Sequence, residues 1–282
     1  MHAATAVGAT VRWADFDPAT GELAPDDVTR LLTARTRLVA VTGASNLLGT
    51  RPDVPAIATA VHDAGALLYV DGVHLTAHAS VDVAALGADF FACSPYKFLG
   101  PHCGVLAAAP ALLETLRPDK LLPATDAVPE RFELGTLPYE LLAGTTAAVD
   151  FLAGLAPGGS GDRGGRRADL VAALAAVEAH EDRLRRRAEA ALLELPGVEV
   201  RSRARHRTAT LLLTFADRDA QDAYEFLARA GVNAPAGSFY ALEPSRHLGL
   251  GDDGGLRVGM APYTDDADVD RLLTAVADFL AS

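Results

Sequence analysis

The chain has 282 residues, of which 50% are hydrophobic, and it carries a formal net charge of -12 at pH 7. This composition is sufficient to bury a full core, as in an ordinary globular protein with one large domain and a smaller one. Acidic and basic residues are interspersed, which argues against a basic footprint for nucleic acid. No apolar run reaches the ~18 to 20 residues of a membrane span, and no signal segment follows Met1. We therefore expect a cytoplasmic protein without nucleic-acid or membrane partners.

In the first half of the chain, short β-rich apolar runs alternate with helical patterns. This alternation is typical of an α/β protein with a mainly parallel sheet. An alanine-rich segment, Pro55–Ala64, has the composition of a helix that ends near Gly65. The predicted strands are Thr10–Ala14, Arg37–Thr42, Ala66–Asp71, Ala88–Cys93 and Cys103–Ala108. We assign residues 1–155 to a large domain built on this sheet.

The second half begins with a Gly-rich stretch over residues 156–165, which predicts a surface loop. Apolar residues at helical spacing then predict one long amphipathic helix over Arg166–Leu195, and we interpret its basic run Arg183–Arg187 as a solvated face. The remaining pattern predicts strands Val198–Arg201, Ala209–Phe215 and Leu256–Met260, and helices Ala220–Ala230 and Asp265–Leu280. Residues 156–282 are therefore predicted to form a linking helix and a small α+β domain.

Polar residues follow three of the predicted strands. Ser45–Thr50 comes after one strand, Asp71–His74 ends the next, and Ser94–Lys97 follows a third. Ligands in open α/β sheets collect outside the carboxyl ends of the strands, so these segments mark the candidate site. Phe98 and a Gly/Pro turn follow Lys97, and partial burial there would lower the pKa of its amine and make it more nucleophilic.

A carboxylate, an imidazole and a lysine at one sheet edge match the needs of pyridoxal phosphate. The cofactor requires an amine for its Schiff base and an acid that keeps the pyridine nitrogen protonated. Taken singly, Lys97 could be a solvent-facing lysine, Asp71 a strand-end cap and His74 a structural histidine. Their joint spacing favours the cofactor site.

The segment Ser45–Gly104 resembles the class V family of pyridoxal-phosphate enzymes, which contains cysteine desulfurases, selenocysteine lyases and kynureninase-like proteins. The branch that it looks most like is the one labelled cysteine desulfurase-like. The motifs that carry the resemblance are Ser45-Asn46 with Gly49-Thr50, Asp71-Gly72-Val73-His74, the run Ser94 to Gly104, Phe132-Glu133-Leu134-Gly135-Thr136 and Arg257-Val258-Gly259. The resemblance implies the fold type I of pyridoxal-phosphate transferases and an enzyme acting at Cα or Cβ of an amino acid, as a lyase or aminotransferase.

The resemblance also implies roles around the cofactor ring. Lys97 would carry the cofactor and then act as general base and acid at the substrate Cα, while Asp71 would pair with the pyridine nitrogen. Asn46 and His74 would lie near the phenolic oxygen of the ring. Arg257 would hold the substrate carboxylate through a bidentate pair.

The phosphate end of the cofactor is expected to be shared between two subunits. Ser94 would reach the phosphate, and Tyr96 stands where most relatives have a histidine, so its contact with the phosphate is the weaker expectation. Gly135 and Thr136 would bind the phosphate of the cofactor in the partner subunit. The resemblance therefore implies a homodimer with shared active sites.

The sequence departs from the cysteine desulfurases at their nucleophile. Those enzymes use a cysteine on a mobile loop that corresponds here to about Pro235–Glu243, and this loop has no cysteine, while Ser238 is too weak a nucleophile to replace one. Cys93 and Cys103 flank Lys97 and are expected to be reduced packing residues rather than persulfide carriers. Two cysteines cannot form a disulfide framework, and their surroundings lack the spacing of a zinc site.

A second departure is that family members carry a further portion ahead of the segment that resembles His2–Phe16. We therefore expect a truncated cofactor domain with an unpaired edge at Thr10–Ala14. This leaves a catalytically inactive dimerising fragment or pseudoenzyme as the alternative function. A nucleotide-binding α/β protein is a third hypothesis, but the Gly-x-Gly-x-x-Gly and Gly-x-x-x-x-Gly-Lys motifs that would support it are absent.

Overall fold

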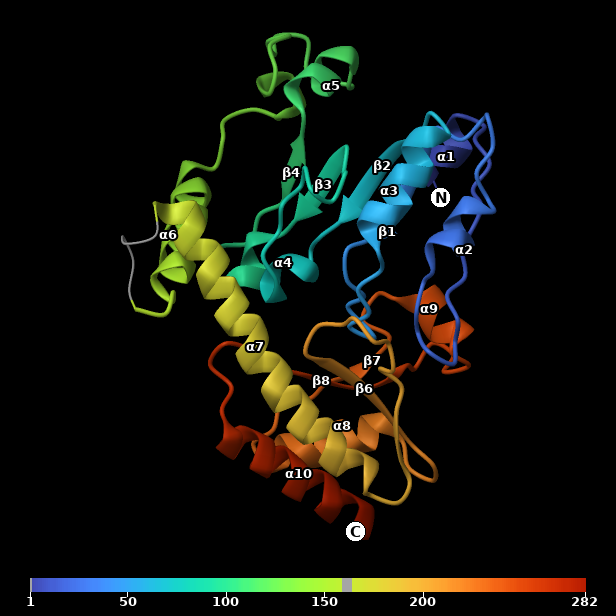
Figure 1. Cartoon of the computed structure of the whole chain (residues 1–282), viewed down its shortest axis with the longest axis vertical. Helices are drawn as coiled ribbons and strands as arrows, with labels where there is room; N and C mark the ends of the chain where they lie inside the picture. Colours follow the sequence, from blue (N-terminus) through green and yellow to red (C-terminus); the bar gives the residue numbers. More distant parts are fainter. Residues whose placement is uncertain (1, 159–163) are drawn as a thin grey trace.

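A computed structural model describes residues 2–158 and 164–282 of the chain (Figure 1). The elements form two four-stranded sheets, one in each half of the sequence, joined by a pair of long helices. The fold class is α/β, as the alternating pattern predicts. Part of the predicted loop over 156–165, residues 159–163, lies outside the described residues.

The first sheet has the strand order β1-β2-β3-β4. Strands β1 (Leu38–Thr42), β2 (Leu67–Asp71) and β3 (Phe90–Cys93) are parallel, and β4 (Val105–Ala108) runs antiparallel to β3. Parallel neighbours require a crossover, and α3 (Val54–Asp63) provides the one between β1 and β2. Its apolar residues at positions 54, 57, 58 and 61 are buried in the core beside β2. The carboxyl ends of the three parallel strands therefore meet at one edge.

The predicted strand Thr10–Ala14 is wrong, because residues 9–17 have no regular structure. Trp13 in this segment is 62% exposed. A strand requires a partner for its N–H and C=O groups, and no neighbouring segment in the described chain supplies one. Only short helices accompany this region, α1 (His2–Ala6) and α2 (Pro25–Thr29).

The other elements of the first half are short, with the exception of α6. They are α4 (Leu75–His78), the 3-10 helix η1 (Pro95–Phe98), α5 (Pro110–Thr115), the 3-10 helix η2 (Glu130–Phe132) and the longer α6 (Tyr139–Gly154). Helix α6 packs against α7 (Arg166–Leu193), which runs from the first half of the molecule to the second (Figure 1). The division of the chain at residues 155 and 156 falls between these two packed helices and stays a prediction.

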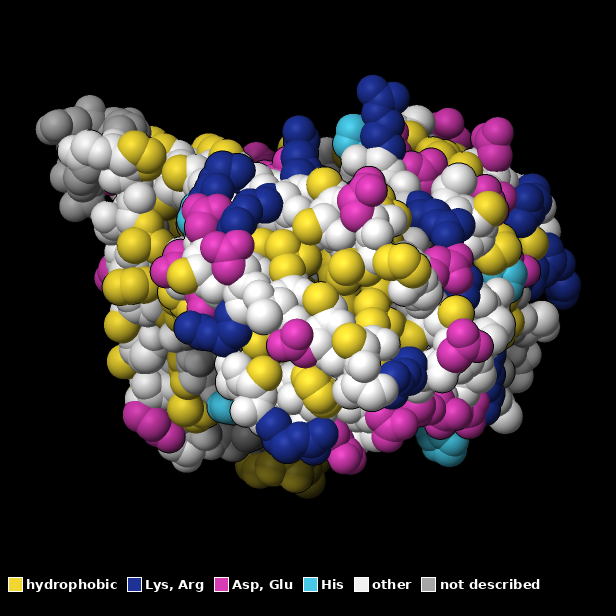
Figure 2. Space-filling model, turned by 90° about the horizontal axis from the view of Figure 1, so that it is seen from below, with side chains coloured by type: hydrophobic (Ala, Val, Ile, Leu, Met, Phe, Trp, Pro, Cys, Tyr) yellow, Lys and Arg dark blue, Asp and Glu magenta, His cyan; other side chains and the backbone are white. Residues whose placement is uncertain are grey.

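Helix α7 buries the predicted apolar stripe, including Leu174, Val177 and Leu184. The predicted solvated basic face is wrong at Arg185, which is buried and ion-paired with acidic residues of the same helix. Arg183 and Arg186 are exposed, Arg187 is half-buried, and all three form ion pairs with acidic residues. On the face at the lower end of Figure 1, Lys and Arg side chains are scattered among Asp and Glu (Figure 2).

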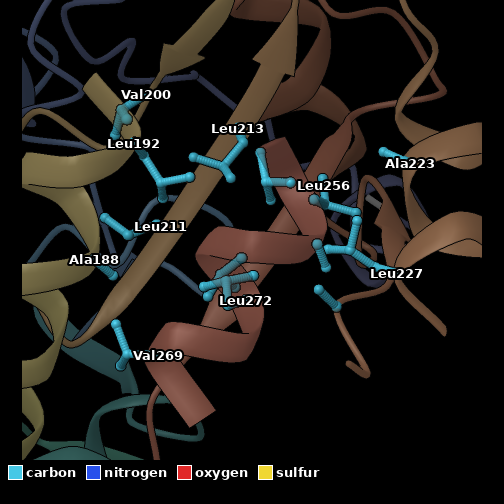
Figure 3. Close-up of a cluster of buried hydrophobic side chains, with 14 of the residues drawn as sticks. Ala188, Leu192, Val200, Leu211, Leu213, Ala223, Leu227, Leu256, Val269 and Leu272 are labelled. Carbon is cyan, nitrogen blue, oxygen red and sulfur yellow. The ribbon is translucent and has the colours of Figure 1, made fainter. Parts of the chain in front are cut away.

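The second sheet is antiparallel and has the order β5-β6-β8-β7. Its strands are β5 (Val198–Val200), β6 (Thr210–Phe215), β7 (Ala236–Gly237) and β8 (Gly255–Gly259). Side chains of β6 and β8, such as Leu213 and Leu256, pack against α8 (Ala220–Arg229), α10 (Asp266–Ala281) and the end of α7 (Figure 3). A short helix, α9 (Leu242–His247), follows β7. Within the described residues, no helix is long and apolar enough to cross a membrane.

Candidate active site

A cavity of about 560 Å³ lies where the parallel strands of the first sheet end. Six of the predicted site residues line it: Asn46, Asp71, His74, Tyr96, Lys97 and Arg257. The second sheet and its loops contribute Thr210, Tyr240, Met260 and Tyr263. The cavity is therefore built by both halves of the chain.

Lys97 lies in η1, directly after β3. The helix ends at Leu99, which adopts a left-handed φ of 68°, so the chain turns back sharply toward β4. The Lys97 Nζ lies 5.0 Å from the centre of the Tyr96 ring and makes no hydrogen bond or ion pair with the described residues. Partial burial, followed by the positive charge of Arg257, lowers the pKa of Lys97, in the direction that the sequence predicts.

Asp71 ends β2, the central strand between β1 and β3. Its Oδ1 accepts a hydrogen bond from the Val73 N–H at 3.0 Å, which fixes the carboxylate at the strand end. The next residue, Gly72, packs so closely on Phe91 that an added Cβ would lie 1.9 Å from the ring. A side chain at position 72 would therefore displace the strand end that carries Asp71.

His74 lies between the two sheets. Its Nε2 is 3.0 Å from the hydroxyl of Thr208 and 3.2 Å from that of Thr210. Burial, followed by the nearby imidazole of His78, lowers the pKa of His74 to about 3. The positive charges of Arg257 and Lys97 act in the same direction. His74 is therefore neutral at neutral pH.

Arg257 reaches the cavity from β8 and is held on two sides. Its Nη1 donates a hydrogen bond to the Asn46 carbonyl at 2.9 Å, and its Cζ lies 3.7 Å from the centre of the Phe239 ring. The Asn46 side chain in turn donates to the Phe239 carbonyl at 2.7 Å. Phe239 and Tyr240 both have positive φ, 52° and 64°, which is an uncommon conformation for residues with side chains. Tyr240 is fully exposed at the mouth of the cavity.

Three predicted residues lie outside the lining of this cavity. Ser94 precedes η1, and its side chain makes no capping hydrogen bond. Gly135 and Thr136 are exposed, and Gly135 has a φ of 76°. Tyr96 lines the cavity with its ring stacked on His102, at 4.9 Å between ring centres and 10° between planes. The predicted phosphate roles of these residues stay predictions.

Sequence reasoning missed one part of the site, the carboxylate of Glu181. This residue is 1% exposed, lies on α7 and lines the cavity together with His78. The available signal was its position in the helix, since Glu181 occupies the gap between Val177 and Leu184 in an otherwise apolar stripe.

Known proteins resemble this chain over most of its length. The family model for aminotransferase class-V matches residues 1–272. An aminotransferase-like protein, FGM3 of Gibberella zeae, is 34% identical over 98% of this chain and 67% of its own length. A cysteine desulfurase of Dickeya dadantii is 31% identical over 91% of this chain and 60% of its own length.

The structural comparison gives the same family. The crystal structure of the cysteine desulfurase CsdA from Escherichia coli matches with a TM-score of 0.85 and 29% identity, covering 99% of this chain and 68% of that one. This chain thus spans about two thirds of the length of such relatives. The protein belongs to the class-V aminotransferase family, among its cysteine desulfurase-like members.

Proposed function

We propose that this chain is a pyridoxal-phosphate-dependent enzyme that acts at Cα or Cβ of an amino acid. The observation that carries the proposal is the placement of the Lys97 amine, the Asp71 carboxylate and the Arg257 guanidinium around one cavity. The amine is without a hydrogen-bond or ion-pair partner in the described chain, so it is free to react. This donor set fits the cofactor, which requires an amine, an acid and a site for the substrate carboxylate.

When bound, pyridoxal phosphate supplies an aldehyde that combines with amines and a protonated ring that withdraws electrons from the substrate Cα. Lys97 would hold the cofactor through its Nζ and, once released by the substrate amine, would move the proton at Cα. Its lowered pKa increases the share of unprotonated amine at neutral pH. Asp71 would hold the proton on the ring nitrogen, because an ionised carboxylate beside that nitrogen favours its charged form.

The remaining cavity residues would orient the two reactants. Arg257 would bind the substrate carboxylate, and its fixed position against Phe239 and Asn46 keeps the guanidinium aimed into the cavity. His74, which is neutral, would form a hydrogen bond at the phenolic oxygen of the ring. Because Asn46 is bonded to Phe239, its amide supports the loop in addition to any contact with the cofactor.

The phosphate end would be completed by a second copy of the chain. Ser94 and Tyr96 would contact the phosphate of their own subunit, whereas Gly135 and Thr136 are exposed and would contact that of the partner. Leu134 and Tyr139 beside them are 75% and 66% exposed, which supports an interface over this region. We therefore propose a homodimer with shared active sites.

The reaction class is that of a lyase or aminotransferase without a protein persulfide. The loop Pro235–Glu243 has Ser238, Phe239 and Tyr240 at its centre and no cysteine. With pyridoxal phosphate bound, a direct elimination or a transamination would require no protein group beyond those that line the cavity. The amino-acid side chain that the enzyme accepts would be set by loops around Tyr240.

The chain has only two lysines, Lys97 and Lys120, so a label on a lysine can be assigned to one of two positions. Purified protein is mixed with pyridoxal phosphate, its absorbance is recorded, and borohydride is added to fix the cofactor to its lysine before peptide mapping. We expect the pyridoxyl group on Lys97. A group on Lys120, or no cofactor band, would contradict the proposal, and the second result would favour an inactive fragment or pseudoenzyme.

A further inference from the structure

A buried acid from α7 reaches the cavity beside the proposed cofactor site. Glu181 is 1% exposed, and its Oε2 accepts a hydrogen bond from His78 Nδ1 at 2.7 Å. Its other oxygen, Oε1, has no hydrogen-bond partner among the described residues. Burial raises the pKa of Glu181, against the lowering effect of the His78 hydrogen bond. A half-satisfied buried carboxylate costs stability, and such groups in native proteins often have a functional reason.

His78 connects this acid to His74. The two imidazole rings pack with their centres 4.7 Å apart and their planes inclined by 56°. His78 is the last residue of α4, and His74 immediately precedes that helix. Because the Nδ1–H of His78 donates to Glu181, rotation of the His78 ring would break a buried hydrogen bond. The ring that packs against His74 is therefore fixed by α7.

The opposite side of His74 is fixed by the second sheet. Its Nε2 lies within hydrogen-bonding distance of both threonine hydroxyls, Thr208 and Thr210. Its Nδ1 has no hydrogen bond within the part of the chain that the structure describes. The Thr208 hydroxyl donates to Thr210 Oγ1 at 3.2 Å, and the Thr210 hydroxyl can in turn donate to His74 Nε2. The neutral ring then carries its proton on Nδ1. This leaves a donor available to a ligand in the cavity.

We infer that Glu181 and His78 form a positioning pair that holds the His74 ring against Thr210, so that the hydrogen bond at Nε2 is kept and Nδ1–H would be available to the phenolic oxygen of the cofactor. The inference rests on the proposed function, because it requires pyridoxal phosphate in this cavity. It assigns a role in the active site to α7, the helix that connects the two halves of the chain. In this role Glu181 acts through His78 and His74.

The test uses Glu181→Gln in the full chain, with Glu178→Gln as the matched control. Glu178 lies one turn away on the same helix and pairs with Arg51 at the surface, outside the cavity lining. Histidine ring nitrogens labelled with 15N report the tautomer of His74 in protein without cofactor. We expect E181Q to shift the His74 signals toward a mixture of tautomers, and E178Q to leave them unchanged. We also expect E181Q to weaken pyridoxal phosphate binding about fivefold, because the neutral amide oxygen holds the His78 N–H less strongly than the carboxylate does.

A second variant covers the outcome that E181Q fails to fold. His78→Asn keeps a donor for Glu181 but removes the ring that packs on His74, and we expect it to change the His74 signals as well. If a folded variant lowers only the free energy of unfolding and leaves the His74 tautomer and cofactor affinity unchanged, the pair is structural and the inference is wrong. If wild-type protein binds no pyridoxal phosphate, the proposed function fails instead, and the nitrogen spectra still decide whether the pair controls His74.

Discussion

The two sheets of this protein differ in how they divide packing and chemistry. The core of the second sheet contains 18 buried hydrophobic residues, whereas the corresponding cluster of the first sheet contains 10. The first sheet, in contrast, places Asp71 and Lys97 at the ends of its parallel strands. The second sheet sends only a few side chains into the cavity, among them Arg257 and Thr210. The sheet with the larger core thus supplies Arg257 and Thr210 to the cavity that Asp71 and Lys97 of the first sheet also line.

The largest effect is expected when the Lys97 amine is removed from the first sheet's side of the cavity. Lys97→Ala should abolish fixation of pyridoxal phosphate by borohydride, because no other amine lies in the cavity lining. It should also lower the turnover of any accepted amino acid by about 10²- to 10⁴-fold, the usual contribution of a general acid-base group. Lys120→Ala is the control, since its Nζ bonds to the Ala124 carbonyl and pairs with Asp126. Retention of the cofactor label in K97A would show that the site has been misassigned.

The next test is directed at the core of the second sheet. Leu192→Ala, at a fully buried position where α7 meets the second sheet, should lower the free energy of unfolding by about 2 to 5 kcal/mol through lost burial and a residual cavity. Its neighbour Leu193 is 59% exposed, and Leu193→Ala should change it by less than about 0.5 kcal/mol. Denaturant titrations of both variants give the comparison. Similar costs for the two would mean that this end of α7 does not pack as described.

A dependence of stability on pH is expected from His74, which lies between the two sheets, and not from the apolar residues of either core. The pKa of His74 is about 3 in the folded chain and 6.5 when unperturbed, so the stability linked to its neutral form is fully present above pH 6.5. Below that pH the unfolded chain binds a proton that the folded chain does not, and stability falls by at most about 1.4 kcal/mol per pH unit until pH 3 is approached.

His74→Gln should remove this part of the pH dependence. Denaturation midpoints of wild type and H74Q are measured between pH 7 and pH 4. His62→Gln is the control, because His62 is partly exposed and lies in the last turn of α3, outside the cavity lining. The difference between wild type and H74Q should change across this range. If it is constant, His74 is protonated in the folded protein at acidic pH, contrary to its burial.

A smaller effect is expected at the contact between Arg257 and the loop that follows β7. Phe239→Leu removes the ring beneath the guanidinium, a cation–π contact of about 0.5 to 2 kcal/mol, so amino-acid binding should weaken by about 2- to 30-fold. The concentration of L-cysteine that half-saturates the change in cofactor absorbance measures this. Arg257→Ala should weaken binding further. If F239L binds as well as wild type, Asn46 alone is sufficient to hold Arg257.

Much of this arrangement follows from the sequence because it depends on local pattern. Apolar runs between turn residues place β1 to β4, and polar residues after those runs place Asp71 and Lys97 at one sheet edge. The strand Thr10–Ala14 could not be decided locally, because a strand requires a partner that the pattern does not specify. The approach of Glu181 to His74 depends on how α7 packs across both sheets, and only its interruption of an apolar stripe gives any sign of it.

The smallest expected effect concerns the two cysteines, which have no role in the predicted chemistry. Cys93 ends β3, and Cys103 lies just before β4. Burial, followed by the nearby Cys103, raises the pKa of the Cys93 thiol, and the Cys103 Sγ lies 3.6 Å from the Thr145 hydroxyl. A thiol with a raised pKa is a poor nucleophile. The double variant Cys93→Ala, Cys103→Ala should therefore release sulfide from L-cysteine at the wild-type rate, whatever that rate is. Mass spectrometry should find no persulfide on either residue in the wild-type chain.

Ser238→Cys provides the positive control, because it places a thiol in the loop Pro235–Glu243 that leads to Phe239 and the cavity. We expect this variant to gain a persulfide at position 238 and sensitivity to alkylation, both of which the wild type should lack. Alkylation-sensitive sulfide release by the wild type, with the persulfide mapped to Cys93 or Cys103, would contradict this prediction. Cys93 or Cys103 would then be a reactive group of the first half of the chain, in addition to Lys97 and Asp71.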